Sequence, residues 1–159
     1  MPTSRRVNHF DDPAAPSPNS LVPAASAIVT NAQGEILLHR RSDNDLWALP
    51  GGAMELGESI LQTVRREVRE ETGLDVEPLR VVGIYTDPRY VVEYSNHEVR
   101  QQFSICFHCR VVGGELHVSS ESTELKFIPS DSIDDLAMHS SNRLRIQHYL
   151  ANRSQPFVT

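Results

Sequence analysis

The stretch that decides the fold is GAMELGESILQTVRREVREETGL, residues 52–74, which contains five carboxylates. Glu67, Glu70 and Glu71 stand at positions i, i+3 and i+4, so a helix would carry all three on one face. Their mutual repulsion would cost about 0.2–0.5 kcal/mol per pair. A divalent cation between the carboxylates removes that cost, and Mg²⁺ binds one or two carboxylates together with substrate phosphates and water. The cluster is therefore a candidate metal site, and the alternative is a solvated acidic helix face.

The residues around the cluster predict where this helix begins and ends. Ser59, with Gln62 three residues later, has the spacing of a capping box. Gly73 is the residue type expected in the left-handed conformation after a helix. Arg66 lies four residues before Glu70 and can hold that carboxylate from the side. An apolar stripe at i, i+4 and i+8 is expected to face the core: Ile60, Val64 and Val68.

With U for an aliphatic residue, the stretch reads G-x5-E-x7-R-E-U-x-E-E-x-G-U, and in this form it resembles a complete Nudix box. The matching residues are Gly52, Glu58, Arg66, Glu67, Val68, Glu70, Glu71, Gly73 and Leu74. Every fixed position is filled, which makes a chance match negligible. WALPGG before the box and GGEL after it also look typical of the family, so the resemblance extends from Pro23 to Leu150.

This resemblance implies a Nudix-type α/β/α sandwich, in which a mixed β-sheet lies between helices. The sequence predicts strands, then one central helix, more strands and a terminal helix. This order of elements agrees with that fold. Strands are expected at 24–30, 35–41, 47–49, 79–86, 91–94, 99–112, 115–118 and 125–128, and the terminal helix at 141–150.

The resemblance also implies a reaction, hydrolysis of the diphosphate bond in a nucleoside diphosphate joined to another group, by attack of water on phosphorus. A divalent cation, Mg²⁺ with Mn²⁺ as a substitute, would stabilise the charge that develops. By resemblance, Glu67 and Glu71 are the principal metal ligands. Glu70 would support them, and the carbonyl oxygen of Gly51 would add one ligand.

Three further roles follow from the resemblance. Glu58 would have a water-mediated or structural role, and Arg66 would orient a carboxylate without contacting the metal. In some Nudix members the general base lies outside the box, on a loop late in the sheet. Glu121 and Glu124 lie in such a loop. Glu121 is the first choice for the base, and Glu70 is the alternative within the box. The other interpretation of Glu121 is a solvated loop glutamate without a catalytic role.

Substrate identity rests on weaker signals. Arginines near the end of the 35–41 strand often contact substrate phosphates in Nudix proteins, which makes Arg40 and Arg41 candidates, with solvated charge as the alternative. Pro88 is similar to the downstream proline of ADP-ribose-type members, whereas Tyr90 is similar to the tyrosine of dinucleoside-polyphosphate members. ADP-ribose or a nucleotide sugar is favoured. The alternatives are a nucleoside triphosphate pyrophosphohydrolase and a module that senses a nucleotide without cleaving it.

The length of 159 residues predicts one domain over 23–153, between an extended arm at 1–22 and a tail at 154–159. The arm is rich in Pro, Asn, Asp and Ser. It could be disordered and have no function, or it could be a strand exchanged across a homodimer. A net charge of −6 gives no general attraction to nucleic acid or membranes, so the expected partner is a small nucleotide.

The two cysteines, Cys106 and Cys109, form a CxxC within an expected strand, FSICFHCRVV. Residues three apart in a strand point to opposite faces, which excludes a shared redox or zinc site in this conformation. We therefore expect two ordinary thiols in a reducing compartment, and a cytoplasmic location.

Overall fold

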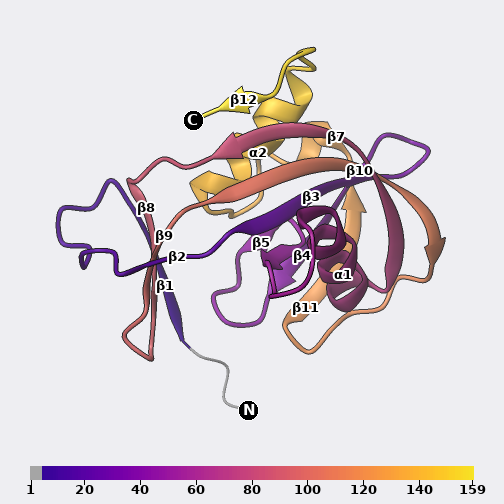
Figure 1. The fold of residues 1–159 in the computed structure, drawn as a ribbon. Coiled ribbons are helices and arrows are strands. Elements are labelled where there is room, and N and C mark those ends of the chain that lie inside the picture. The colour runs from indigo at the N-terminus through magenta and orange to yellow at the C-terminus, as the bar shows by residue number, and fades with distance from the viewer. Residues whose placement is uncertain (1–4) are drawn as a thin grey trace.

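The computed structural model describes residues 5–159, which form two β-sheets and two α-helices (Figure 1). Along the larger sheet the strands are β11 (Ser122–Ile128), β4 (Ile36–Arg41), β3 (Ala24–Thr30), β10 (Ser104–Gly114), β7 (Leu74–Tyr85) and β12 (Phe157–Val158). Two short strands extend it: β5 (Trp47–Ala48) pairs with β4, and β6 (Gly51–Ala53) pairs with β3. β10 is parallel to β3 and antiparallel to β7, so the sheet is mixed.

The two helices, α1 (Ile60–Thr72) and α2 (Ser140–Leu150), cover opposite faces of this sheet (Figure 1). Strand neighbours alternate between the two cores. Ile28 and Leu38 pack in the core that includes Ile146 of α2, whereas Val29 and Leu37 pack in the core that includes residues of α1. The predicted α/β/α sandwich with a mixed sheet is confirmed.

The cysteines illustrate this alternation. Cys106 belongs to the core beneath α2 and Cys109 to the core beneath α1, and both are free and fully buried. Burial raises the pKa of each thiol, to about 12 for Cys109, so neither is a reactive thiolate near neutral pH. The prediction of two ordinary strand thiols is confirmed.

Local signals set the ends of α1 as the sequence predicts. The Ser59 hydroxyl accepts a hydrogen bond from the Gln62 N–H, and the Gln62 side chain accepts one from the Ser59 N–H, which completes the capping box. Gly73 takes the left-handed conformation with φ of 77°. Val64 and Val68 are fully buried against the sheet. Helix α1 therefore has a fixed length and one fixed face toward β3 and β6.

The second sheet contains residues that the sequence assigned to an extended arm. Its strand order is β1 (Arg6–Phe10), β8 (Tyr90–Tyr94), β9 (Val99–Gln101) and β2 (Ser20–Leu21). β1 pairs antiparallel with β8, and β2 pairs parallel with β9, both within the same chain. The described part of the arm is therefore ordered, and its strands pair within this chain; a strand exchanged across a homodimer stays a prediction. Its strands depend on partners about 80 residues away, which a local reading of composition does not detect.

Other differences from the predicted elements have similar causes. The strand expected at 99–112 is divided into β9 and β10 where the chain passes from the small sheet to the large one. No strand forms at 115–118, because Glu115 and His117 donate their N–H groups to Gly73 and Thr72 at the end of α1. The expected tail contains β12, which extends the large sheet beside β7. Leu150, expected on the apolar side of α2, is exposed.

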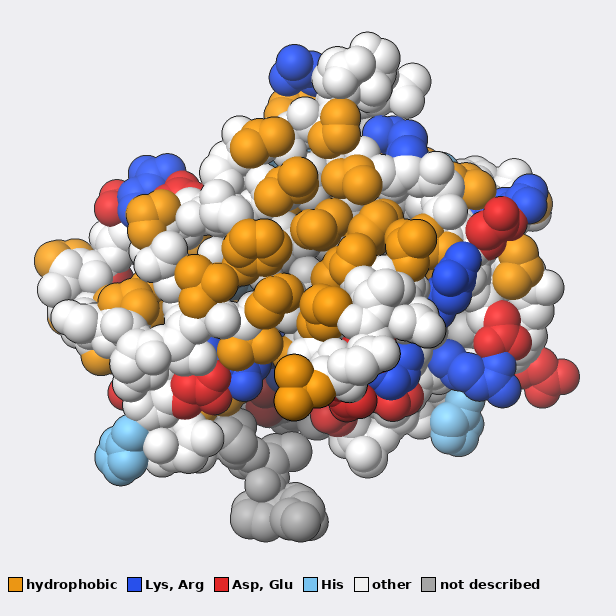
Figure 2. Space-filling model, in the orientation of Figure 1, with side chains coloured by type: hydrophobic (Ala, Val, Ile, Leu, Met, Phe, Trp, Pro, Cys, Tyr) orange, Lys and Arg blue, Asp and Glu red, His pale blue; other side chains and the backbone are white. Residues whose placement is uncertain are grey.

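The surface seen in Figure 2 has hydrophobic side chains gathered over β3, β10 and β7, with charged side chains mostly at the edge of that area. No helix within residues 5–159 is long and apolar enough to span a membrane. A homodimer stays a prediction.

Candidate functional site

The centre of the site is a pair of carboxylates on the sheet-facing side of α1. Glu71 is only 7% exposed, and the side chain of Glu67 is 15% exposed. The two carboxyl groups share a hydrogen bond, and the N–H of Gly51 donates to Glu71 Oε2 over 3.4 Å. Burial, and then the charge of Glu67, raise the pKa of Glu71 well above its ordinary value. With nothing positive between them, the two groups therefore resist being ionised together.

His39 lies behind this pair, and the sequence analysis did not assign it a role. Its Nε2 is 3.4 Å from Glu71 Oε2, and its Nδ1 is 2.8 Å from Ser122 Oγ. Burial lowers the pKa of His39 to about 4, with a further contribution from the charge of Arg41. The imidazole is therefore neutral at physiological pH and orients Glu71 without neutralising it. The only sequence signal for the role of His39 is its place within an apolar strand.

Arg66 is the hub of the hydrogen bonds on the outer side of the pair. Its Nε and Nη2 bind both oxygens of Glu58, over 3.0 and 2.7 Å. Its Nη1 donates to Glu67 Oε1 over 2.8 Å and to Glu70 Oε2 over 3.2 Å. Arg66, and then the N–H of Glu55, lower the pKa of Glu58 to about 2. The arginine thus fixes the position of one carboxylate of the buried pair.

Glu67, Glu70 and Glu71 do not converge on one point. Glu70 is directed outward, with 60% of its side chain exposed. Within residues 5–159 its one ion-pair partner is Arg66. Within residues 5–159 no group of three or more His, Cys, Asp or Glu side chains is arranged to hold a metal ion. The Glu67–Glu71 pair alone still suits Mg²⁺, which commonly binds one or two protein carboxylates and completes its shell with water and phosphate oxygens.

Gly52 explains why the box begins with glycine. A Cβ atom at this position would lie 2.5 Å from the Glu67 carboxyl carbon and 2.6 Å from its Oε1. Such a contact would displace the Glu67 side chain, which is the movable partner. Backbone therefore approaches the carboxylate pair closely at β6, and the neighbouring Gly51 N–H already binds Glu71.

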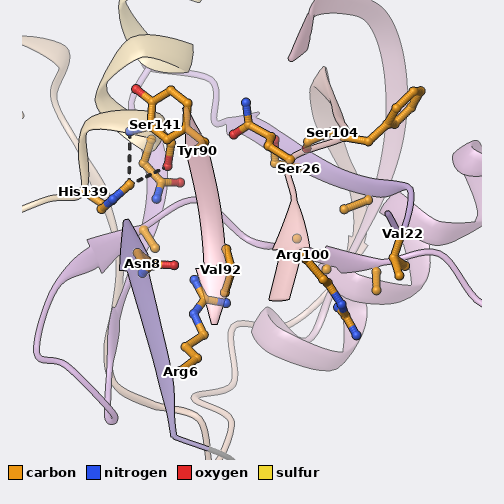
Figure 3. Close-up of a pocket in the computed structure, with 18 of the residues that line it drawn as sticks. Arg6, Asn8, Val22, Ser26, Tyr90, Val92, Arg100, Ser104, His139 and Ser141 are labelled. Carbon is orange, nitrogen blue, oxygen red and sulfur yellow. Dashed lines mark hydrogen bonds between the residues drawn. The ribbon is translucent and has the colours of Figure 1, made fainter. Parts of the chain in front are cut away.

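A cavity of about 190 Å³ opens beside Gly51 and Gly52. Its walls come from strands of both sheets and from α2; the strands are β1, β3, β4, β5, β6, β8, β9 and β10. Figure 3 shows Arg6 and Asn8 on β1 next to Val92 of β8, with Ser26 and Ser104 on another wall and the hydrogen-bonded pair of His139 and Ser141 at a third. Residues of both sheets thus line one cavity that extends to Gly51 and Gly52, the β6 residues in contact with the two carboxylates.

The arginines predicted for substrate binding have different positions. Arg41 lines the cavity and forms a two-pronged pair with Asp43, over 2.9 and 2.6 Å. Arg40 is not part of the cavity wall, because it binds Asp45 and Glu124 over 2.7 and 3.0 Å.

Arg6 lines the same cavity, although the sequence analysis left it in the arm. Its Nε atom is buried and has no hydrogen-bond partner within residues 5–159. Burial, followed by the charge of Arg41, lowers the pKa of Arg6, and the charge of Glu71 acts in the opposite direction. Arg6 therefore stands near both Arg41 and the carboxylate pair. No local sequence signal could place it there, because only the pairing of β1 with β8 does so.

The model for the NUDIX domain family matches residues 20–149. The chain belongs to the NUDIX family. A MutT-like protein of Streptomyces ambofaciens is 34% identical over 112 residues, which are 70% of this chain and 66% of that protein. An ADP-ribose pyrophosphatase of Methanocaldococcus jannaschii is 33% identical over 112 residues, 69% of this chain and 63% of that protein. The chain therefore spans slightly less than two thirds of the length of these NUDIX relatives.

Solved NUDIX structures have the same fold. A MutT protein from Methanosarcina mazei has a TM-score of 0.68 and 26% identity, and the match covers 89% of this chain and 100% of the other. An ADP-ribose pyrophosphatase from Streptococcus suis has a TM-score of 0.63 and 27% identity, with 87% and 98% covered.

The two candidate bases that the sequence placed in the late loop also differ. Glu124 lies in β11 and not in the loop, and its carboxylate is engaged by Arg40 over 3.0 Å and lies 3.5 Å from Lys126. Glu121 is exposed, and its backbone oxygen accepts hydrogen bonds from the N–H and hydroxyl of Ser42. The charge of Glu121 acts on both Glu71 and Arg41. Glu121 is therefore the loop glutamate at the rim of the site.

The Glu58–Arg66 pair gives a test by pH. Because the pKa of Glu58 is lowered to about 2 from the ordinary 4.5, its ionised form stabilises the folded protein above pH 4.5 and that contribution disappears as pH falls toward 2. Glu58→Gln should therefore be less stable than the wild type at pH 6, and the two should converge in acid. Urea unfolding across this pH range measures the difference.

Glu77→Gln removes an exposed ion pair with Arg110 and serves as the control, with a smaller effect at pH 6. A stability difference for Glu58→Gln that stayed constant down to pH 2 would contradict the role given to Arg66.

Proposed function

We propose that the chain is a divalent-metal-dependent pyrophosphohydrolase that cleaves the diphosphate bond of a nucleoside diphosphate linked to another group. One observation carries the proposal: a buried, mutually repelling carboxylate pair, Glu67 and Glu71, adjoins a cavity lined by arginines. Carboxylates attract a hard cation and guanidinium groups attract phosphate, so both halves of a metal–diphosphate complex have matching partners.

The donor set fits Mg²⁺ or Mn²⁺. Glu67 and Glu71 would hold the ion, with Glu70 in support from the exposed side and the Gly51 carbonyl oxygen as a further ligand. When bound, the ion would lower the pKa of a water molecule and stabilise charge on the phosphoryl oxygens. A metal ion binds the ionised carboxylate and therefore competes with the proton on Glu71. Because the pKa of Glu71 is raised, affinity for the metal should increase with pH.

The other residues bind and orient. Arg66 holds Glu67 in place through the 2.8 Å hydrogen bond, and His39 supports Glu71 from behind. Arg41 and Arg6, which lie on the wall of the cavity, would bind the diphosphate oxygens. Arg40, the other arginine indicated by the sequence, is less suited to binding the diphosphate because its guanidinium already binds Asp45 and Glu124.

Glu121 is proposed as the general base, with Glu70 as the alternative. Glu121 belongs to an exposed loop at the rim, from which its side chain can reach a water molecule beside the diphosphate. Glu70 is the second choice because its carboxylate is bound to Arg66.

ADP-ribose or a nucleotide sugar is the favoured substrate class. The relatives named ADP-ribose pyrophosphatase support this choice, and those named MutT-like support the runner-up, a nucleoside triphosphate pyrophosphohydrolase. A module that senses a nucleotide without cleaving it is disfavoured because every carboxylate of the box is present.

Formation of the nucleoside monophosphate from a panel of diphosphate-linked nucleotides and nucleoside triphosphates, with Mg²⁺, tests the proposal. EDTA should abolish turnover. Glu71→Gln and Glu67→Gln each remove a ligand charge and should lower kcat at least about a hundredfold while the protein stays folded. Glu77→Gln, on a distant exposed strand position, is the matched control. Near wild-type turnover by Glu71→Gln at saturating Mg²⁺ would overturn the metal site.

The base assignment predicts a pH dependence. Hydroxide replaces a general base as pH rises, whereas a metal ligand is needed at every pH. Glu121→Gln should lose rate at neutral pH and recover part of it in alkaline buffer, and Glu124→Gln should show little of either effect. A pH–rate profile of both variants beside Glu70→Gln measures this. Alkaline recovery in Glu70→Gln alone would move the base to the helix.

A further inference from the structure

The cavity beside the carboxylate pair is more basic than the chain around it. Among the described residues, its lining includes four arginines and no aspartate or glutamate, although the whole chain has a net charge of −6. The four are Arg6, Arg41, Arg100 and Arg145. Arg41 and Arg100 are each paired with a carboxylate outside the lining, Asp43 and Glu98. Arg6 and Arg145 have no carboxylate partner within residues 5–159.

Arg145, on α2, is the more unusual of these two. It is only 9% exposed, and its one hydrogen bond to a side chain runs from Nη2 to Gln102 Oε1 over 3.3 Å. Its Nε atom is buried and has no hydrogen-bond partner among the residues that the structure describes, and its guanidinium lies 5.1 Å from the centre of the Tyr85 ring. Burial lowers the pKa of Arg145. A buried guanidinium that lacks a counter-charge is costly, which indicates a group selected to bind something.

Arg145 lies on a different part of the cavity wall from the residues next to the carboxylate pair, because it belongs to α2 whereas Gly51 and Gly52 belong to β6. The charge of Glu71 acts on Arg6, whereas the groups that act on Arg145 are Cys106, Tyr85 and Tyr90. Two neighbouring polar groups complete this part of the wall. Gln102 has an amide that can donate, and the Ser26 hydroxyl is buried with only the Cys106 thiol beside it.

We propose that this part of the cavity wall, formed by Arg145, Gln102 and Ser26, binds a phosphate group of the substrate other than the scissile diphosphate. A guanidinium with a free Nε–H and further donors nearby suits the several acceptor oxygens of a phosphate. The inference rests on the proposed function, because it assumes that the diphosphate lies between Arg6, Arg41 and the carboxylate pair. It restricts the substrate class to nucleotides that carry an additional phosphate.

A purely structural role for Arg145, through its contact with Tyr85, predicts a different result. If Arg145 serves ligand binding, Arg145→Met removes an uncompensated buried charge and should leave the Tm of the empty protein unchanged or raise it by about 2–4 °C. If Arg145 serves the fold, the same substitution should lower Tm. Arg145→Lys keeps the charge and provides a second variant.

The decisive experiment measures binding in EDTA, so that no hydrolysis occurs. Calorimetry compares ADP-ribose with its 2′-phosphate, and ADP with its 3′-phosphate and with ATP. For the wild type, at least one additional phosphate should tighten binding about tenfold or more. In Arg145→Met that gain should fall to about twofold or less, and Arg145→Lys should retain part of it. Arg110→Met removes an exposed arginine of β10 and should keep the full gain.

Turnover of the same nucleotides with Mg²⁺ is measured in parallel. A phosphate-dependent gain in affinity without turnover would contradict the proposed hydrolase and support the phosphate site. Turnover without any such gain, or a gain that persists in Arg145→Met, would overturn the phosphate site and leave the hydrolase intact. A lowered Tm of Arg145→Met together with an unchanged gain would assign Arg145 to the fold.

Discussion

The rest of the site depends on the burial of one carboxylate, Glu71, next to another, Glu67. Two like charges in a region from which water is largely excluded are unfavourable unless a proton or a cation accompanies them. The surrounding structure keeps them there. Val64 and Val68 fix the face of α1 toward the sheet, and the capping box fixes the point at which the helix begins. The fold thus maintains an unfavourable pair of like charges that, in the proposed function, a divalent cation would stabilise.

The small sheet encloses a cavity beside this carboxylate pair. The pairing of β1 with β8 brings Arg6 to the wall of this cavity, which the backbone of β6 also lines. Arg145 of α2 lies on another part of the wall. Two carboxylates of α1 therefore lie next to a cavity whose wall carries two arginines without a carboxylate partner among residues 5–159. An anion that brings its own divalent cation complements both at once.

Local signals made α1 predictable. Ser59, Gly73 and the spacing of the box fixed its ends, its buried face and its carboxylates, and the cysteines alternate as a strand requires. Convergence of distant residues was not predictable. His39 reaches Glu71, and Arg6 and Arg145 reach one cavity, only because the sheets and α2 bring segments far apart in sequence together. Of these three residues, only His39 has a local sequence signal, as a histidine within an apolar strand.

The most direct test of the central claim is the Tm of Glu71→Gln beside the wild type, in EDTA and in Mg²⁺. Since the pKa of Glu71 is raised above 4.5, the metal-free wild type loses stability as pH increases through the range above that value, and the glutamine variant avoids the loss. In EDTA at pH 8 the variant should have the higher Tm, and Mg²⁺ should reverse the order by stabilising only the wild type. A lower Tm for the variant in EDTA, with no response of the wild type to Mg²⁺, would contradict the account.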